Sequence, residues 1–192
     1  ATFGELIQSG KVGHVGTSNF CGFACFGDLL SPLLAMAEKD TRYPRIEVEQ
    51  PRYNLLNRAE YEDQLQSIAV STGLGIVTYS SLASGFLSGA FRPGIEPVGE
   101  RASQLRQYFT PSGWSLIETL DAIGARHEVP LASVALAWAL AQPGVTSTII
   151  GPDSIAQLAE ASYAPAVKLD EGEISALNER SWDASAPEFV DW

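Results

Sequence analysis

Apolar and polar positions follow two different periods along this chain. Short apolar, β-branched runs end at polar or glycine-bearing turns, a pattern typical of buried strands. Longer segments repeat apolar residues three and four positions apart, which is typical of helices. The pattern predicts strands at 11–17, 46–50, 75–79 and 145–150. It predicts helices at 2–9, 24–39, 59–72, 112–127, 131–141, 154–161 and 170–180.

Glycine and proline mark where these elements start and stop. Gly10 directly follows the first helical segment and is expected to end it. Pro32 falls inside the second segment, where it is tolerated if the helix starts near Ser31 and Pro32 lies in its first turn. Residues 83–110 are rich in both residue types and predict a long irregular connection. Connections of this length are usually functional or mobile.

The alternation of strands and helices predicts the fold class. Strands separated by helices form a parallel sheet through right-handed crossovers, so the chain is expected to be an α/β protein. Its 192 residues suffice for one domain with a substantial core. In such folds ligands bind beyond the carboxyl ends of the strands.

Three predicted strand ends carry candidate binding residues. The strand at 75–79 ends in Tyr79, whose ring can stack on a flat ligand, and the loop after it is rich in hydroxyls and glycine. Free backbone N–H groups in such a loop can hold phosphate oxygens. Ser18 and Asn19 follow the first strand, and Gln50 ends the second. Each also has a plainer interpretation: a cap on the next helix for Ser18 and Asn19, a satisfied strand end for Gln50, and a core ring for Tyr79.

Net charge and cysteine content limit the kinds of binding partner and metal site expected for this chain. Twelve basic and 23 acidic residues give a net charge of −11, which argues against nucleic acid and anionic membrane surfaces as partners. No apolar run approaches the roughly 20 residues that span a bilayer, and the first residues do not resemble a signal peptide. Cys21 and Cys25 share a helix face if that segment is helical, so half a metal site or a redox pair is one interpretation.

Two free thiols are the favoured interpretation, because neither His14 nor His127 has metal-ligand spacing to the cysteines. Free thiols suit a reducing cytoplasm, which is the expected location. His14 stands alone between Gly13 and Val15 and is not expected to be catalytic, and His127, near a helix end, is expected to be structural.

Four segments resemble the aldo-keto reductase family. They read GKVGHVGTSNF at 10–20, EVEQPRYNLL at 47–56, YSSLASGFLSG at 79–89 and IIGPDSIAQLAE at 149–160. They are similar, in order, to that family's fifth, sixth and seventh strands and to its eighth strand with the nucleotide-binding helix. The resemblance runs from near residue 1 to about residue 180. It implies a TIM-type (β/α)8 barrel, of which residues 1–192 form the C-terminal, cofactor-binding half.

The resemblance also implies a reaction and a cofactor. The family moves hydride between NADPH or NADH and an aldehyde, ketone or keto-sugar. Ser18, Asn19 and Gln50 would bind the nicotinamide carboxamide, for which a Ser/Asn/Gln set supplies both donors and acceptors, and Tyr79 would stack on the ring. The remaining cofactor contacts fall on two groups of residues. The pyrophosphate would lie along Ser80, Leu82, Ser84 and Gly85, and the adenosine end near Arg101, Gly151, Asp153, Gln157 and Glu160. Without the resemblance, Arg101 would be taken for a solvated surface charge.

Three positions depart from the family pattern at the adenosine end. Asp153 stands where many bacterial members have Arg, Lys or Ser, Ala90 where Lys is common, and Ala161 where Asn is usual. A carboxylate at 153 repels a 2′-phosphate but can accept a hydrogen bond from a free ribose hydroxyl. We therefore expect either that NADH is preferred over NADPH or that both cofactors bind weakly.

The other departure is the missing half of the barrel. The family's catalytic Asp, Tyr, Lys and His lie on its first four strands, and nothing in this chain matches them, so no catalytic residue is assigned. Four βα units leave open sheet edges and an exposed inner face, which the missing N-terminal half or a second copy would cover. The alternatives to an oxidoreductase are a non-catalytic nucleotide-sensing or interaction module, or an inactive fragment.

Overall fold

A parallel sheet forms the centre of the structure, a computed structural model that describes residues 2–19, 26–40, 43–95 and 102–181. Its strands are β1 (Val15–Thr17), β2 (Ile46–Glu49), β3 (Gly75–Thr78) and β4 (Val145–Thr148). Their order in the sheet is β1-β2-β3-β4, and each strand pairs in parallel with the next one along the chain. The predicted α/β class is confirmed, and each strand lies where the pattern placed it but is shorter.

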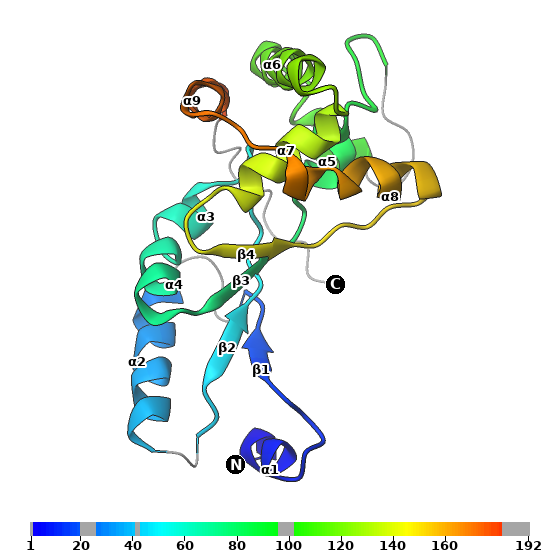
Figure 1. The fold of residues 1–192 in the computed structure, drawn as a ribbon. Coiled ribbons are helices and arrows are strands. Elements are labelled where there is room, and N and C mark those ends of the chain that lie inside the picture. The colour runs from blue at the N-terminus through cyan, green and yellow to red at the C-terminus, as the bar shows by residue number, and fades with distance from the viewer. Residues whose placement is uncertain (1, 20–25, 41–42, 96–101, 182–192) are drawn as a thin grey trace.

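Helices fill the connections between the strands. The first helix, α1 (Thr2–Gln8), precedes β1, and α2 (Phe26–Lys39) lies between β1 and β2. Between β2 and β3 lie α3 (Ala59–Glu62) and α4 (Gln66–Thr72). Between β3 and β4 are η1 (Ala83–Ser88), α5 (Ala102–Arg106), α6 (Pro111–His127) and α7 (Leu131–Leu140). After β4 come α8 (Ile155–Ser162), η2 (Ala164–Ala166) and α9 (Glu171–Arg180). Figure 1 shows α2 and α4 along one side of the strands, with α5 to α9 gathered beyond β3 and β4.

The helix predicted at 24–39 is present as α2. It begins at Phe26, so Pro32 lies inside the helix and not in the first turn of a helix that starts near Ser31. Leu30 and Leu34, on either side of Pro32, are 1% and 4% exposed. Burying two leucines contributes about 3–6 kcal/mol, which offsets the hydrogen bond that proline cannot donate.

Two other segments contain more separate helical elements than the pattern predicted. The helix expected over 59–72 is interrupted by a turn between α3 and α4. The backbone at Asp63 and Leu65 stays right-handed there, and the Leu65 N–H still donates to the Tyr61 carbonyl at 2.9 Å. The connection at 83–110, expected to be irregular, contains η1 and α5.

The core is built around α7. Residues 131–139 are all buried, so this Ala- and Leu-rich helix is enclosed nearly all round. Trp138 stacks on Tyr53, with ring centroids 5.3 Å apart, and Tyr53 in turn contacts the Tyr61 ring at 4.7 Å. These rings tie the segment after β2 to the helix before β4.

Glu173 joins α9 to α6. It is 5% exposed and forms a capping box with Asp170, accepting the Asp170 N–H at 3.0 Å. The same carboxylate lies 2.9 Å from His127 Nε2 and 3.1 Å from an Arg126 guanidinium nitrogen. His127 therefore has the structural contact expected of it.

The β4 side of the sheet is open among the described residues. β1 and β4 each pair on one side only. Apolar side chains after β4 are exposed: Ile149 by 41%, Ile155 by 88% and Leu158 by 50%. Within the described part of the chain, no helix combines the length and apolar character needed to cross a bilayer.

Candidate functional site

Asn19 connects the carboxyl ends of three strands. It lies two residues after the end of β1 and has a left-handed backbone, with φ +47°. Its N–H donates to Glu49 Oε1 on β2 at 2.9 Å, and its Nδ2 donates to the Tyr79 hydroxyl after β3 at 3.0 Å. One residue thus joins positions 30 and 60 residues away along the chain.

Ser18 and Gln50 lie beside this connection. Ser18 Oγ donates to the Gln50 carbonyl at 3.0 Å, and the Gln50 N–H donates to the Thr17 carbonyl at 2.9 Å. The structure therefore brings Ser18, Asn19, Gln50 and Tyr79 together, as the sequence predicted. These bonds of Ser18 and Asn19 reach the ends of neighbouring strands, and they are not bonds of a cap on the next helix.

Asn19 also presents a buried acceptor. Its Oδ1 has no accessible surface and no hydrogen-bond partner among the described residues. A buried amide oxygen left unpaired costs about 1–3 kcal/mol, so a ligand N–H placed there is favoured. Tyr79, next to it, is half-buried, so part of its surface is free to face a ligand.

Sequence reasoning missed Glu49. Strand alternation puts it on the same face as Glu47, which is exposed, yet Glu49 is 0% exposed. One carboxyl oxygen accepts from the Asn19 N–H and the other from Thr17 Oγ1. Burial raises the pKa of Glu49, and the two hydrogen bonds oppose that rise. An alternating pattern carries no signal for such a residue, because the cover over it comes from elsewhere in the fold.

The loop after β3 has an unusual backbone. Ser80, Ala83 and Ser84 are non-glycine residues at φ +54°, +47° and +56°, and Gly85 follows at +97°. Asn54 Nδ2 donates to the Ser80 carbonyl at 2.9 Å and anchors the start of the loop. Left-handed residues cost about 1 kcal/mol or more each and cluster at ligand sites.

Leu82 connects this loop to α8. Its side chain packs against the buried cluster of Leu136, Ala161 and Ala164. Its carbonyl accepts the Gly85 N–H at 2.9 Å. The Gly85 N–H is thereby used within the loop, and the predicted contact of Gly85 with a pyrophosphate stays a prediction.

The predicted adenosine contacts lie on the β4–α8 segment. Gly151, Asp153 and Gln157 are exposed, and Glu160 is half-buried. Gln157 Oε1 accepts the Asp153 N–H at 2.7 Å, so this side chain is engaged in the helix start. The Gln157 Nε2 group can still donate to a ribose oxygen while Oε1 keeps this bond. Arg101, Cys21 and Cys25 lie outside the described residues.

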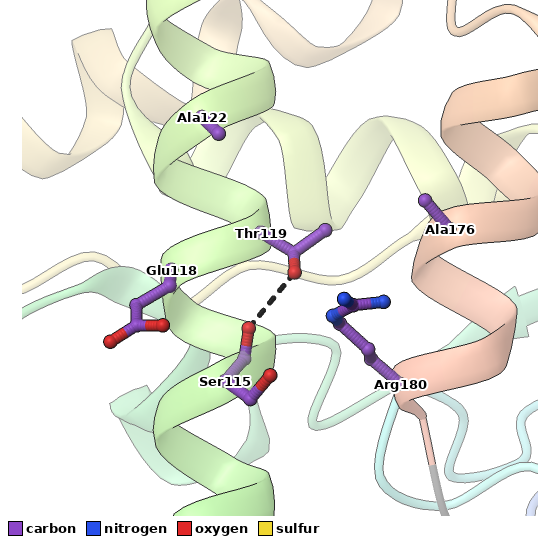
Figure 2. Close-up of a pocket in the computed structure, with 6 residues that line it drawn as sticks. All are labelled: Ser115, Glu118, Thr119, Ala122, Ala176 and Arg180. Carbon is purple, nitrogen blue, oxygen red and sulfur yellow. Dashed lines mark hydrogen bonds between the residues drawn. The ribbon is translucent and has the colours of Figure 1, made fainter.

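A hollow lies between α6 and α9. Figure 2 shows Arg180 of α9 reaching toward α6, while Glu118 points away from it. The lining residues are Ser115, Glu118, Thr119, Ala122, Ala176 and Arg180. Thr119 Oγ1 donates to the Ser115 carbonyl at 2.9 Å. None of the predicted site residues lines this hollow.

Acidic, histidine and cysteine side chains do not gather into a metal site in the described ranges, where no group of three or more is suitably placed. His14 Nδ1 lies 2.6 Å from Glu47 Oε2 in an exposed pair. The polar residues at the strand ends therefore remain the candidate site.

A sequence profile of the Aldo/keto reductase family matches residues 1–181. The chain belongs to the aldo/keto reductase family. It is 34% identical over 177 residues to an uncharacterized oxidoreductase, YrpG, of Bacillus subtilis (strain 168), covering 92% of this chain and 51% of that protein. It is 32% identical over 157 residues to Protein tas of Escherichia coli (strain K12), covering 80% and 43%.

Two further comparisons give a sequence relative named as a channel subunit and a solved structure with a similar fold. The chain is 35% identical over 120 residues to a probable voltage-gated potassium channel subunit beta of Oryza sativa subsp. japonica, covering 59% of this chain and 36% of that protein. Its structure resembles that of a thermostable aldo-keto reductase, Tm1743, solved with the inhibitor epalrestat. The TM-score is 0.64 at 22% identity, with 94% of this chain and 53% of that chain covered.

These comparisons confirm the family and the TIM-barrel type of fold. The chain spans about half the length of the curated relatives it matches. Aldo/keto reductases generally use NAD(P)H, and the residues that Asn19 joins lie where a parallel α/β fold binds ligands. The individual cofactor contacts stay predictions.

Proposed function

We propose that this aldo/keto reductase binds a nicotinamide cofactor across the carboxyl ends of β1, β2 and β3. In the complete protein the cofactor would exchange hydride with an aldehyde, ketone or keto-sugar. The observation that carries the proposal is the buried Asn19 Oδ1, an acceptor without a partner among the described residues, next to the half-buried Tyr79. A carboxamide NH₂ is the kind of donor this acceptor requires.

The surrounding side chains complement the rest of the carboxamide. Ser18 and Gln50 supply hydroxyl and amide groups at the adjoining strand ends. Holding the carboxamide fixes which face of the nicotinamide ring meets the substrate, and ring stacking on Tyr79 covers the other face. The cofactor supplies the hydride, and this chain's residues orient it. We assign no proton donor here, because the residues of the family's catalytic tetrad have no match in this chain.

Ligand titration tests the proposal directly. We expect the wild-type protein to quench or enhance NADH fluorescence with saturation, and Tyr79→Ala to weaken binding. Stacking on an aromatic ring contributes about 1–3 kcal/mol, so the dissociation constant should rise about 5- to 150-fold. Tyr163→Ala is the matched control, since Tyr163 is 52% exposed at the end of α8. Equal affinities for the two variants would contradict the stacking role, and no wild-type binding of NADH or NADPH would contradict the function.

We also propose that NADH binds more tightly than NADPH. Asp153 is an exposed carboxylate at the start of the α8 segment, and exposed Ala90 supplies no positive charge. A 2′-phosphate near Asp153 is repelled, whereas a free ribose hydroxyl can donate to it. The dissociation constants of NADH and NADPH should differ in favour of NADH, and Asp153→Ser should narrow the difference. Tighter NADPH binding by the wild type would contradict this preference.

The open sheet edges support a proposal about assembly. β1 and β4 each lack a second neighbour among the described strands, and the apolar Ile155 and Leu158 are exposed beside β4. We propose that the remaining strands of a barrel cover these surfaces. Sedimentation of the 192-residue chain should then show self-association that a longer polypeptide with all eight strands does not show. A stable, dispersed monomer of the short chain would contradict this.

A cofactor-binding module without turnover is the second candidate. It is favoured by the similarity to a protein named as a channel beta subunit. Binding of NADH without reduction of any aldehyde or ketone, in a protein that includes all eight strands, would support this alternative. Turnover would support the oxidoreductase.

A further inference from the structure

Glu49 is a buried acid that the proposed hydride transfer does not use. It ends β2, directly before Gln50, and is 0% exposed. Both of its carboxyl oxygens accept hydrogen bonds, one from Thr17 Oγ1 and one from the Asn19 N–H. Burying a carboxyl group is costly unless its hydrogen bonds are made, so the fold keeps this group with both partners in place.

Of the two hydrogen-bond partners of Glu49, Asn19 is the one proposed to bind the cofactor. Its left-handed backbone, φ +47°, is disfavoured for residues other than glycine, although asparagine tolerates it better than most. The 2.9 Å bond from its N–H to Glu49 holds that conformation. In that conformation Nδ2 reaches Tyr79 and Oδ1 stays buried without a described partner. Glu49 therefore controls where the Asn19 side chain lies.

We propose that Glu49 is a positioning residue for the nicotinamide end of the cofactor. It acts through Asn19 and does not itself touch the cofactor. The inference rests on the proposed function, since it requires that Asn19 binds the carboxamide. The proposal concerns only the nicotinamide end of the cofactor. The adenosine end is predicted to lie on the β4–α8 segment.

Three substitutions separate the possible contributions of Glu49. Glu49→Gln removes the charge but keeps an oxygen that can accept from Asn19, while its amide can donate to Thr17 Oγ1. Glu49→Leu keeps much of the volume and removes the acceptor. Glu49→Asp keeps the acid but shortens the side chain by one methylene, which withdraws the carboxylate from Asn19.

The experiment compares NADH with ADP-ribose, which has the adenosine end but no nicotinamide. We expect Glu49→Leu and Glu49→Asp to weaken NADH binding about tenfold or more, because the Asn19 N–H loses its acceptor. Their affinity for ADP-ribose should stay within about twofold of the wild type, because the adenosine end does not depend on Asn19. Glu49→Gln should bind both ligands within about threefold of the wild type.

The outcomes are distinguishable. If Glu49→Leu or Glu49→Asp weakens NADH and ADP-ribose equally, Glu49 is merely structural and the inference is wrong. If neither variant changes NADH binding, it is also wrong. Thermal unfolding of each variant identifies any that fails to fold, and Glu49→Asp carries the test if Glu49→Leu does not fold. If the wild type binds ADP-ribose but binds NADH no more tightly, the nicotinamide group adds nothing to the affinity. That result would overturn both the inference and the proposed nicotinamide site.

Discussion

Replacing Glu173 by alanine removes the carboxylate that joins α9 to α6. Three contacts are lost at once: the capping bond to the Asp170 N–H, the bond to His127 Nε2 and the ion pair with Arg126. Glu173 is 5% exposed, so its carboxylate is withdrawn from water and depends on these protein contacts.

The magnitude follows from the contacts. A helix-capping interaction contributes about 1 kcal/mol, and a hydrogen bond to a charged group about 1.5–3 kcal/mol. The Arg126 side chain is 61% exposed, so its pair with Glu173 contributes little. We expect Glu173→Ala to lower the free energy of unfolding by about 3 kcal/mol. For a chain of this size that lowers Tm by roughly 6–12 °C.

Urea unfolding followed by tryptophan fluorescence and by circular dichroism measures this change. Glu171→Ala is the matched control, because Glu171 is an exposed glutamate in the first turn of the same helix. Its loss should cost only about 0.3–1 kcal/mol through the helix dipole. The reasoning is refuted if Glu173→Ala costs less than about 1 kcal/mol, or no more than Glu171→Ala.

Three more predictions concern the core and the site. Gly144→Ala should destabilise the protein by about 2 kcal/mol or more in urea unfolding, because φ is +84° and the new Cβ would lie 2.6 Å from the Tyr61 hydroxyl; an unchanged midpoint would contradict it. Tyr61→Phe should cost about 1 kcal/mol in the same assay, since its hydroxyl donates to the Pro143 carbonyl at 2.6 Å. Because burial raises the pKa of Glu49 above 4.5, the folded protein holds that proton more tightly than the unfolded chain. Its contribution to stability is therefore present at low pH and is lost as pH rises through the raised pKa, and Tm plotted against pH should lose this component in Glu49→Gln.

The sequence predicts the positions of the strands well, because each is a short apolar run bounded by turn residues. It also predicts which strand ends meet, since parallel strands present their carboxyl ends at one edge. Ser18, Asn19, Gln50 and Tyr79 are therefore found together. The place of Pro32 within α2 was harder to predict, because proline favours the first turn of a helix and here lies between two buried leucines inside one.

The pattern of apolar and polar positions does not predict contacts that form only in the assembled fold. Glu49 alternates with Val48 as a solvent-facing residue does, yet it is covered and bonded to Asn19. Gln157 accepts a hydrogen bond from the Asp153 N–H at the start of its own helix, which the pattern did not indicate, and its ribose contact stays a prediction. Both outcomes are set by partners that local periodicity does not encode.

The order of the strands has a consequence for how the protein assembles. Each strand pairs only with the next along the chain, so the sheet can grow by adding one βα unit at a time. Asn19 comes from the first unit but bonds to Tyr79, 60 residues later, after the third strand. A ligand bound at this junction therefore stabilises only chains that have already joined three strands. Intermediates with two strands gain nothing from it, and protection from proteolysis by such a ligand begins when β3 is in place.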